Sequence, residues 1–144
     1  MKSVIKSLRV MQRMERLATA LYRAQVRAFR QEQIIERLRA ATDNEQEHAE
    51  TLSESIHKLG GTPAQIGIFF QMAGTILGFF TTLCSKKFLL KTDIWIEEQA
   101  IKDYGAFLQK VDFDEETVSL INRIVDDEKR HVATWQDSIE LLKS

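Results

Sequence analysis

Two short stretches decide the fold of this chain: "DNEQEHAE", Asp43 to Glu50, and "DDEKRHVA", Asp126 to Ala133. Each carries a Glu three residues before a His, as Glu45/His48 and Glu128/His131, although the chain has only 3 histidines. Residues three apart share a face of an α-helix, so each pair presents a carboxylate and an imidazole together. One such pair is weak evidence, because a buried polar network or a charged helix surface explains it equally well. Two pairs in the same frame raise the question of a shared metal site.

The similarity extends beyond the two quoted stretches. At an offset of 83 residues (131 − 48), seven identities recur: Asp43, Glu45, His48, Thr51, Ser55, Ile56 and Leu59 match Asp126, Glu128, His131, Thr134, Ser138, Ile139 and Leu142. Upstream, Glu15 precedes Tyr22 by seven residues, and Glu97 precedes Tyr104 by seven. The repeat predicts two helical hairpins of related pattern, which together form an all-α four-helix bundle.

The repeated polar residues fall within apolar stripes at helical spacing. The stripe of the last helix, for example, contains Ile121, Ile124, Glu128, His131 and Trp135. Ionised carboxylates among apolar side chains are unfavourable unless they are paired or bind a metal ion. We therefore predict a metal site formed by Glu15, Glu45, His48, Glu97, Glu128 and His131.

The depth of these residues along the hairpins agrees with one site. The midpoint of Glu97 and Glu128 falls at residues 111–113, where turn residues occur, and Asp114 is the expected N-cap of the last helix. The midpoint of Glu15 and Glu45 is Arg30, so we place a turn near residues 29–32. No strong helix breaker lies there, and a continuous first helix would permit a homodimer with swapped helices.

Oxygen and imidazole ligands in this number suit two iron ions, or two manganese ions. Four carboxylates balance two divalent ions, and Glu45 and Glu128 are the expected bridging ligands. Tyr22 and Tyr104 are candidate hydrogen-bond donors to the ligands. The competing interpretation is a metal-free helical interaction module that kept the pattern.

The composition argues against several other classes of protein. The 144 residues predict a single domain, 1–144, and the net charge of −1 gives no electrostatic case for nucleic acid. The only Cys, Cys84, excludes an internal disulfide and a Cys-based metal site in one chain. The basic N-terminus lacks an uninterrupted apolar run, so we expect no secretory signal and a cytoplasmic protein.

An apolar segment joins the two hairpins. Thr62-Pro63 predicts a helix start, and Ile66 to Cys84 contains no charged residue, so we expect a helical crossover of about Pro63–Cys84. A membrane-spanning helix would put the hairpins on opposite sides of a bilayer and is rejected. Phe69, Phe70, Phe79 and Phe80 with Lys86-Lys87 suit contact with the inner face of a membrane. Gly74 and Gly78 suit close packing against a helix or a dimer partner, and the residues alone leave both alternatives open.

These motifs resemble the ferritin-like di-iron carboxylate superfamily, and most closely its demethoxyubiquinone hydroxylase family. The similar segments are "SLRV" before Glu15, "NEQEHAETL", "GTPAQIGIFFQMAGTILGFFTTL", "TDIWIEEQAIKDY" and "DDEKRH". The sequence departs from the family pattern in two places: "MQRM" (Met11 to Met14) replaces Asp-His-Ala-Gly, and Asp103 replaces a His.

The resemblance implies a di-iron oxidoreductase of ubiquinone biosynthesis, a monooxygenase that activates O2 or peroxide. It would hydroxylate a quinone-like lipophilic substrate at a membrane surface with a separate electron donor. The alternative is a rubrerythrin-like peroxidase or an iron-handling protein of the same fold.

Overall fold

The computed structural model describes residues 1–65 and 67–143, except for the side chains of residues 67, 68, 70 and 71. All regular elements among these residues are helical, which confirms the all-α prediction. They are α1 (Lys2–Gln25), the short 3-10 helix η1 (Val26–Ala28), α2 (Glu32–Lys58), α3 (Gly67–Thr82), α4 (Lys86–Lys110) and α5 (Glu115–Leu141).

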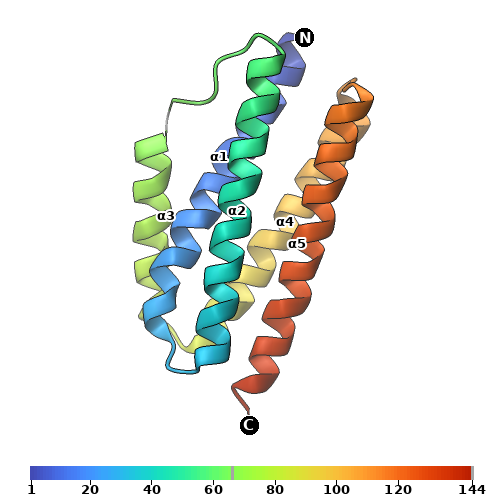
Figure 1. The fold of residues 1–144 in the computed structure, drawn as a ribbon. Helices are drawn as coiled ribbons and strands as arrows, with labels where there is room; N and C mark the ends of the chain where they lie inside the picture. The colour runs from blue at the N-terminus through green and yellow to red at the C-terminus, as the bar shows by residue number, and fades with distance from the viewer. Residues whose placement is uncertain (66, 144) are drawn as a thin grey trace.

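An antiparallel bundle is formed by α1, α2, α4 and α5, and α3 lies outside it (Figure 1). α1 pairs with α2 and α4 pairs with α5, so the two predicted hairpins are confirmed. α3 runs back along the outside of the bundle and packs mainly on α1. It therefore serves as the crossover that returns the chain to the end where α4 begins.

The turn of the first hairpin lies where the depth argument placed it. α1 ends at Gln25, η1 follows, and α2 begins at Glu32. Phe29 has an extended backbone (φ −111°, ψ 151°), and its side chain is buried in the core. The burial of one aromatic side chain thus fixes a turn that no local breaker residue marks.

The predicted crossover helix is present, but it is shorter than the expected span of about Pro63–Cys84. The helix spans Gly67–Thr82 instead of Pro63–Cys84, because the chain before it is attached to α1. Arg9 Nε donates to the Thr62 carbonyl (2.7 Å), and the Ala64 amide donates to the buried Gln12 Oε1 (2.9 Å). At the other end, Ser85 caps α4 by accepting from the Phe88 amide (3.2 Å). Ile66 lies outside the described residues.

Two glycines allow α3 to approach α1 closely. A Cβ on Gly74 would lie 2.5 Å from the Leu17 carbonyl oxygen, and one on Gly78 would lie 2.6 Å from the Ala24 Cβ. Both distances are too short for a side chain, so the predicted close packing is confirmed. None of the described helices is both long enough and apolar enough to cross a bilayer.

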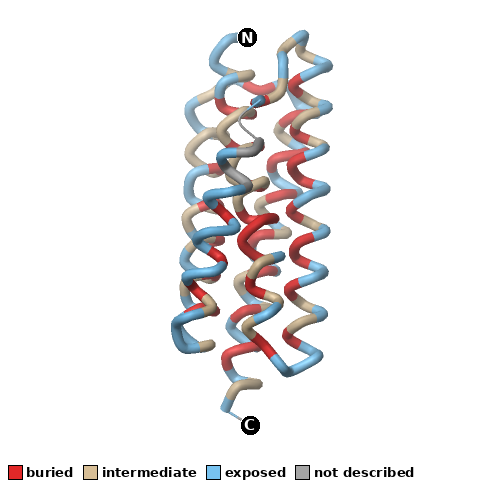
Figure 2. Tube along the Cα trace, turned by 90° about the vertical axis from the view of Figure 1, so that its left-hand side faces the viewer, coloured by how far each residue is buried: buried red, intermediate tan, exposed pale blue. Residues whose placement is uncertain are grey.

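Two apolar clusters fill the bundle, one toward each end. One contains Tyr22, Leu38, Leu89 and Trp135, and the other contains Met11, Leu52, Tyr104 and Ile124. Buried residues line the inner faces of the helices along the bundle (Figure 2). On each bundle helix the predicted metal ligands lie between the residues of the two clusters, which leaves a polar layer in the middle of the core.

Candidate metal centre

The structure brings all six predicted ligands into that polar layer. Each of these residues is at most 9% exposed. They form two groups whose ligand atoms lie within 4.8 Å of one another: Glu15, Glu45, His48 and Glu128, and Glu45, Glu97, Glu128 and His131. Glu45 and Glu128 belong to both groups, which is the arrangement that two ions with bridging carboxylates require.

His48 turns its two nitrogens in opposite directions. Its Nδ1 faces the layer, 3.3 Å from Glu128 Oε1 and 3.5 Å from Glu15 Oε2. Its Nε2 pairs with Asp127 Oδ2 at 2.9 Å, and Arg130 contacts the other Asp127 oxygen. A carboxylate in this position fixes the tautomer and the orientation of a ligating imidazole.

Sequence reasoning missed Asp127. It directly precedes Glu128 and sits at the edge of the apolar stripe, 19% exposed, so the spacing argument did not include it. A weak signal was present, because Asn44 occupies the matched position before Glu45 and is also polar.

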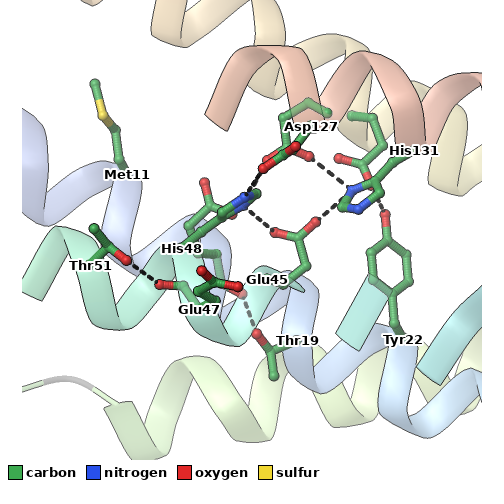
Figure 3. A network of polar contacts seen from close by, with 12 residues as sticks. Met11, Thr19, Tyr22, Glu45, Glu47, His48, Thr51, Asp127 and His131 are labelled. Atoms are coloured by element: carbon green, nitrogen blue, oxygen red, sulfur yellow. Dashed lines mark hydrogen bonds and ion pairs between the residues drawn. The ribbon is translucent and has the colours of Figure 1, made fainter. Parts of the chain in front are cut away.

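His131 approaches the layer from the other side. Its Nδ1 lies 2.9 Å from Glu45 Oε1, and 3.2 Å from both Glu97 Oε1 and Glu128 Oε2. The Glu45 carboxylate therefore lies between the two imidazole rings (Figure 3). Both histidines offer the same nitrogen to the layer.

The two tyrosines connect the hairpins crosswise. The Tyr22 hydroxyl on α1 donates to Glu97 on α4, and the Tyr104 hydroxyl on α4 donates to Glu15 on α1. Both rings are fully buried. Each tyrosine therefore holds a carboxylate of the opposite hairpin, as the predicted supporting role requires.

The electrostatics of the metal-free layer reflect crowding of carboxylates. Burial and the neighbouring Glu128 and Glu15 raise the pKa of Glu45 well above its usual value. Burial and Glu15 also raise the pKa of Glu128 to about 8, although both histidines oppose this.

For both imidazoles and for Glu97, charged neighbours outweigh the effect of burial on the pKa. Burial alone would lower the pKa of each imidazole, but hydrogen bonds to three carboxylates raise the pKa of His48 and of His131 to about 12. Burial would raise the pKa of Glu97, yet His131 holds it below its usual value. Without metal, protons therefore take the role of the positive charge in the layer.

A cavity of about 170 Å³ adjoins the layer. Its apolar wall consists of Met14, Leu17, Ala18, Ile96 and Ala100, from α1 and α4. Its polar residues are Glu15, Glu45, Glu97, Glu128 and Tyr104. The four carboxylates thus face an apolar space in which a lipophilic group fits.

A family model described as "Ubiquinone biosynthesis protein COQ7" matches residues 2–140. The chain belongs to the COQ7 family. This is a ferritin-like di-iron family that includes demethoxyubiquinone hydroxylase, so the resemblance noted in the sequence is confirmed. A comparison with curated proteins finds no match.

The residues of this COQ7 chain fit the di-iron centre that the family implies. Three buried polar atoms lack a well-aligned hydrogen bond in the described structure: Glu45 Oε1, His48 Nδ1 and Glu128 Oε1. They lie only at ion-pair distances from their neighbours, 2.9 Å between Glu45 Oε1 and His131 Nδ1 and 3.3 Å between His48 Nδ1 and Glu128 Oε1. Buried polar atoms are rarely left without a partner, and all three belong to the donor types that bind iron. A cation between them would satisfy each atom.

The departures from the COQ7 pattern lie around the cavity and at the surface. Met11 is fully buried, Met14 lines the cavity, and Asp103 is exposed. The polar layer itself keeps every predicted ligand. The changes therefore reach the wall of the cavity at Met14 and leave the predicted ligands in place.

Proposed function

We propose that this chain is a non-haem di-iron hydroxylase that acts on a quinone-like lipophilic substrate. The observation that carries the proposal is the pair of four-ligand groups that share Glu45 and Glu128 beside an apolar cavity. The COQ7 family is a hydroxylase family of ubiquinone biosynthesis, which supports the same reaction class.

In this proposal each group holds one iron ion. Glu15 and His48 would hold the first, Glu97 and His131 would hold the second, and Glu45 and Glu128, which belong to both groups, would contribute to both. When bound, the iron pair supplies the activation of O2 or peroxide, with electrons from a separate donor. The four carboxylates neutralise two divalent ions and so stabilise them in a core that excludes water.

The surrounding residues hold the ligands in place. Asp127 fixes the His48 ring so that Nδ1 points into the layer, and the tyrosines orient Glu15 and Glu97. Such partners restrict the ligand geometry before metal binds.

The cavity holds the reacting end of the substrate. Its volume of about 170 Å³ is smaller than the roughly 300 Å³ at which typical ligand pockets begin, so a lipid tail would extend outside. Leu17 lines the cavity, and its carbonyl also lies against the Gly74 position of α3. One residue of the cavity wall, Leu17, therefore also contacts the crossover helix α3.

We further propose that α3 contacts a membrane surface. Its outer side exposes Phe69, Met72, Ile76, Phe79 and Phe80, each more than half accessible. Phe88 and Trp95 on α4 are also more than half exposed. A membrane contact here would bring lipid tails close to the cavity.

The test is a hydroxylation assay with the iron-loaded protein, a chemical reductant and a short-chain demethoxyquinone. The proposal predicts a hydroxylated product that contains oxygen from isotopically labelled O2, and no product from Glu128→Ala. Rapid peroxide turnover without any hydroxylated quinone would contradict the proposal and favour a peroxidase.

A further inference from the structure

A second groove lies on the outside of the bundle, between α1 and α3, and has a volume of about 340 Å³. Arg23 lines it from α1 and Arg27 from η1, while Thr75, Phe79 and Thr82 line it from α3. None of the described residues that line the groove carries a carboxylate. The groove is thus cationic on one wall and apolar with hydroxyl groups on the other.

The basic side chains of the groove are available for an anion. Both arginines are exposed, and no carboxylate among the described residues pairs with either of them. Arg23 makes one long hydrogen bond, 3.4 Å, to Gln46 Oε1. Thr82 already donates its hydroxyl to the Phe79 carbonyl at 2.6 Å. Arg23 and Arg27, four residues apart, therefore place two cationic side chains at the groove, and neither forms an ion pair with a carboxylate of the described residues. A guanidinium group suits a phosphate because it can donate two parallel hydrogen bonds.

The groove continues into the apolar surface of α3. Phe79 stands within it and is 59% exposed, and Phe80 and Leu83 follow at 59% and 69%. A free phosphate ion would contact only the basic wall. A phospholipid would place its phosphate against the arginines and its acyl chains along the phenylalanines, so it would use both walls.

We propose that this groove binds the phosphate headgroup of an anionic phospholipid. The inference rests on the proposed membrane contact of α3 and adds to it a defined headgroup site. Binding at this site would orient the bundle on the membrane, because Leu17 places the cavity beside the same helix.

The matched controls for this site are Lys86 and Lys87, which lie at the start of α4 outside the groove lining. We compare two double variants, Arg23→Gln/Arg27→Gln and Lys86→Gln/Lys87→Gln. Each of them removes two positive charges near the same end of α3. A general attraction to an anionic surface would weaken equally in both, by roughly fivefold for each residue removed. A headgroup site predicts a loss at least about tenfold larger in the arginine variant.

The experiment measures binding of the intact protein to two kinds of vesicle: phosphatidylcholine alone, and phosphatidylcholine with phosphatidylglycerol. We expect the wild type to prefer the mixed vesicles, and we expect the arginine variant to lose that preference while the lysine variant keeps most of it. Arg23→Lys/Arg27→Lys should bind between the two, because it keeps the charge but not the bidentate geometry. Equal losses in the arginine and lysine variants would overturn the headgroup site.

Further measurements distinguish the headgroup site from the membrane contact of α3 on which it rests. Phe79→Ser/Phe80→Ser should weaken binding to both kinds of vesicle. If the wild type binds neither kind, the membrane contact fails and the site fails with it. If it binds both kinds equally, the contact stands and the headgroup site is overturned. Competition by millimolar inorganic phosphate as strong as that by the lipid would also overturn it, in favour of a free anion.

Discussion

The two hairpins place the same residue types at the same depth, yet they differ in what surrounds them. Each provides a carboxylate and a tyrosine from its first helix and a Glu-His pair from its second, and the hydrogen bonds of the tyrosines cross between them. The repeated pattern therefore accounts for the whole polar layer.

The two hairpins differ in the residues that lie next to the repeated ones. His48 pairs with Asp127, whereas the matched position beside His131 is Asn44. One turn before Glu97 stands Asp93, and the matched position before Glu15 is Met11; both are fully buried. The comparison teaches that the layer is symmetric in its proposed ligands and asymmetric in its support, so the two metal positions should differ in affinity.

Removing a shared carboxylate should have the largest effect. Glu45→Ala or Glu128→Ala takes a ligand from both groups, and we expect metal content to fall below about one ion per chain. Glu15→Ala and Glu97→Ala each take a ligand from one group and should leave about one ion. Metal analysis of the four purified variants distinguishes the cases, and equal retention in all four would contradict the shared role.

The Asp127 pair is the next test of the asymmetry. Asp127→Asn makes the support of His48 resemble that of His131 and should lower metal affinity at the first group by about tenfold or more. Asn44→Asp is the reciprocal variant, and we expect it to strengthen the second group. Stepwise titration with Fe²⁺ measures both, and an unchanged first affinity in Asp127→Asn would remove the positioning role.

The crossing tyrosines should act on opposite groups. Tyr22→Phe leaves Glu97 without its donor, and Tyr104→Phe does the same to Glu15, each with a loss of about 1 to 2 kcal/mol. We therefore expect Tyr22→Phe to weaken the metal position of His131 and Tyr104→Phe to weaken that of His48. If either variant weakens both positions equally, the crosswise pairing is not what supports the ligands.

The pH dependence should have opposite signs without and with metal. The pKa of His48 and His131 rises from 6.5 to about 12 on folding, so their stabilising contribution is complete below 6.5 and is lost as pH rises toward 12. The raised pKa of Glu128, from 4.5 to about 8, acts in the same direction between those values.

Metal-free protein should therefore be less stable in urea at pH 9 than at pH 6, whereas metal affinity should increase with pH because binding releases protons. Urea unfolding of the metal-free protein at both pH values tests the first half. Greater stability at the higher pH would contradict the protonated layer.

Asp93 should give the smallest effect. Burial raises its pKa well above 3.8, and the hydrogen bond from Gln25 (2.8 Å) offsets this only in part. The carboxylate therefore destabilises the fold increasingly as pH rises above 3.8, and Asp93→Asn should stabilise the protein at neutral pH by about 1 kcal/mol. Met11→Leu at the matched position should change stability without any pH dependence. A destabilised Asp93→Asn would show that the charge is compensated.

The polar layer could be predicted from the sequence because its signals are local and repeated. Glu15 and Glu97 interrupt apolar stripes at the depth of the two Glu-His pairs, and burial makes such interruptions informative. Asp114 marked a helix start by its own chemistry, because its side chain accepts a hydrogen bond from the Thr117 amide (2.7 Å).

Features that depend on packing between helices could not be read in the same way. The start of α3 depends on contacts that Arg9 and Gln12 make from another helix, so the local signal of Thr62-Pro63 was misleading. The partner of each tyrosine depends on how the two hairpins meet. Asp127 reaches His48 only because α5 lies beside α2.

The most direct test of the central claim is the metal stoichiometry of the intact protein, measured by anaerobic titration with Fe²⁺. The arrangement of two ligand groups around Glu45 and Glu128 predicts about two iron ions per chain, in two steps of different affinity. A folded protein that binds no iron, or that saturates at one ion, would contradict the di-iron centre.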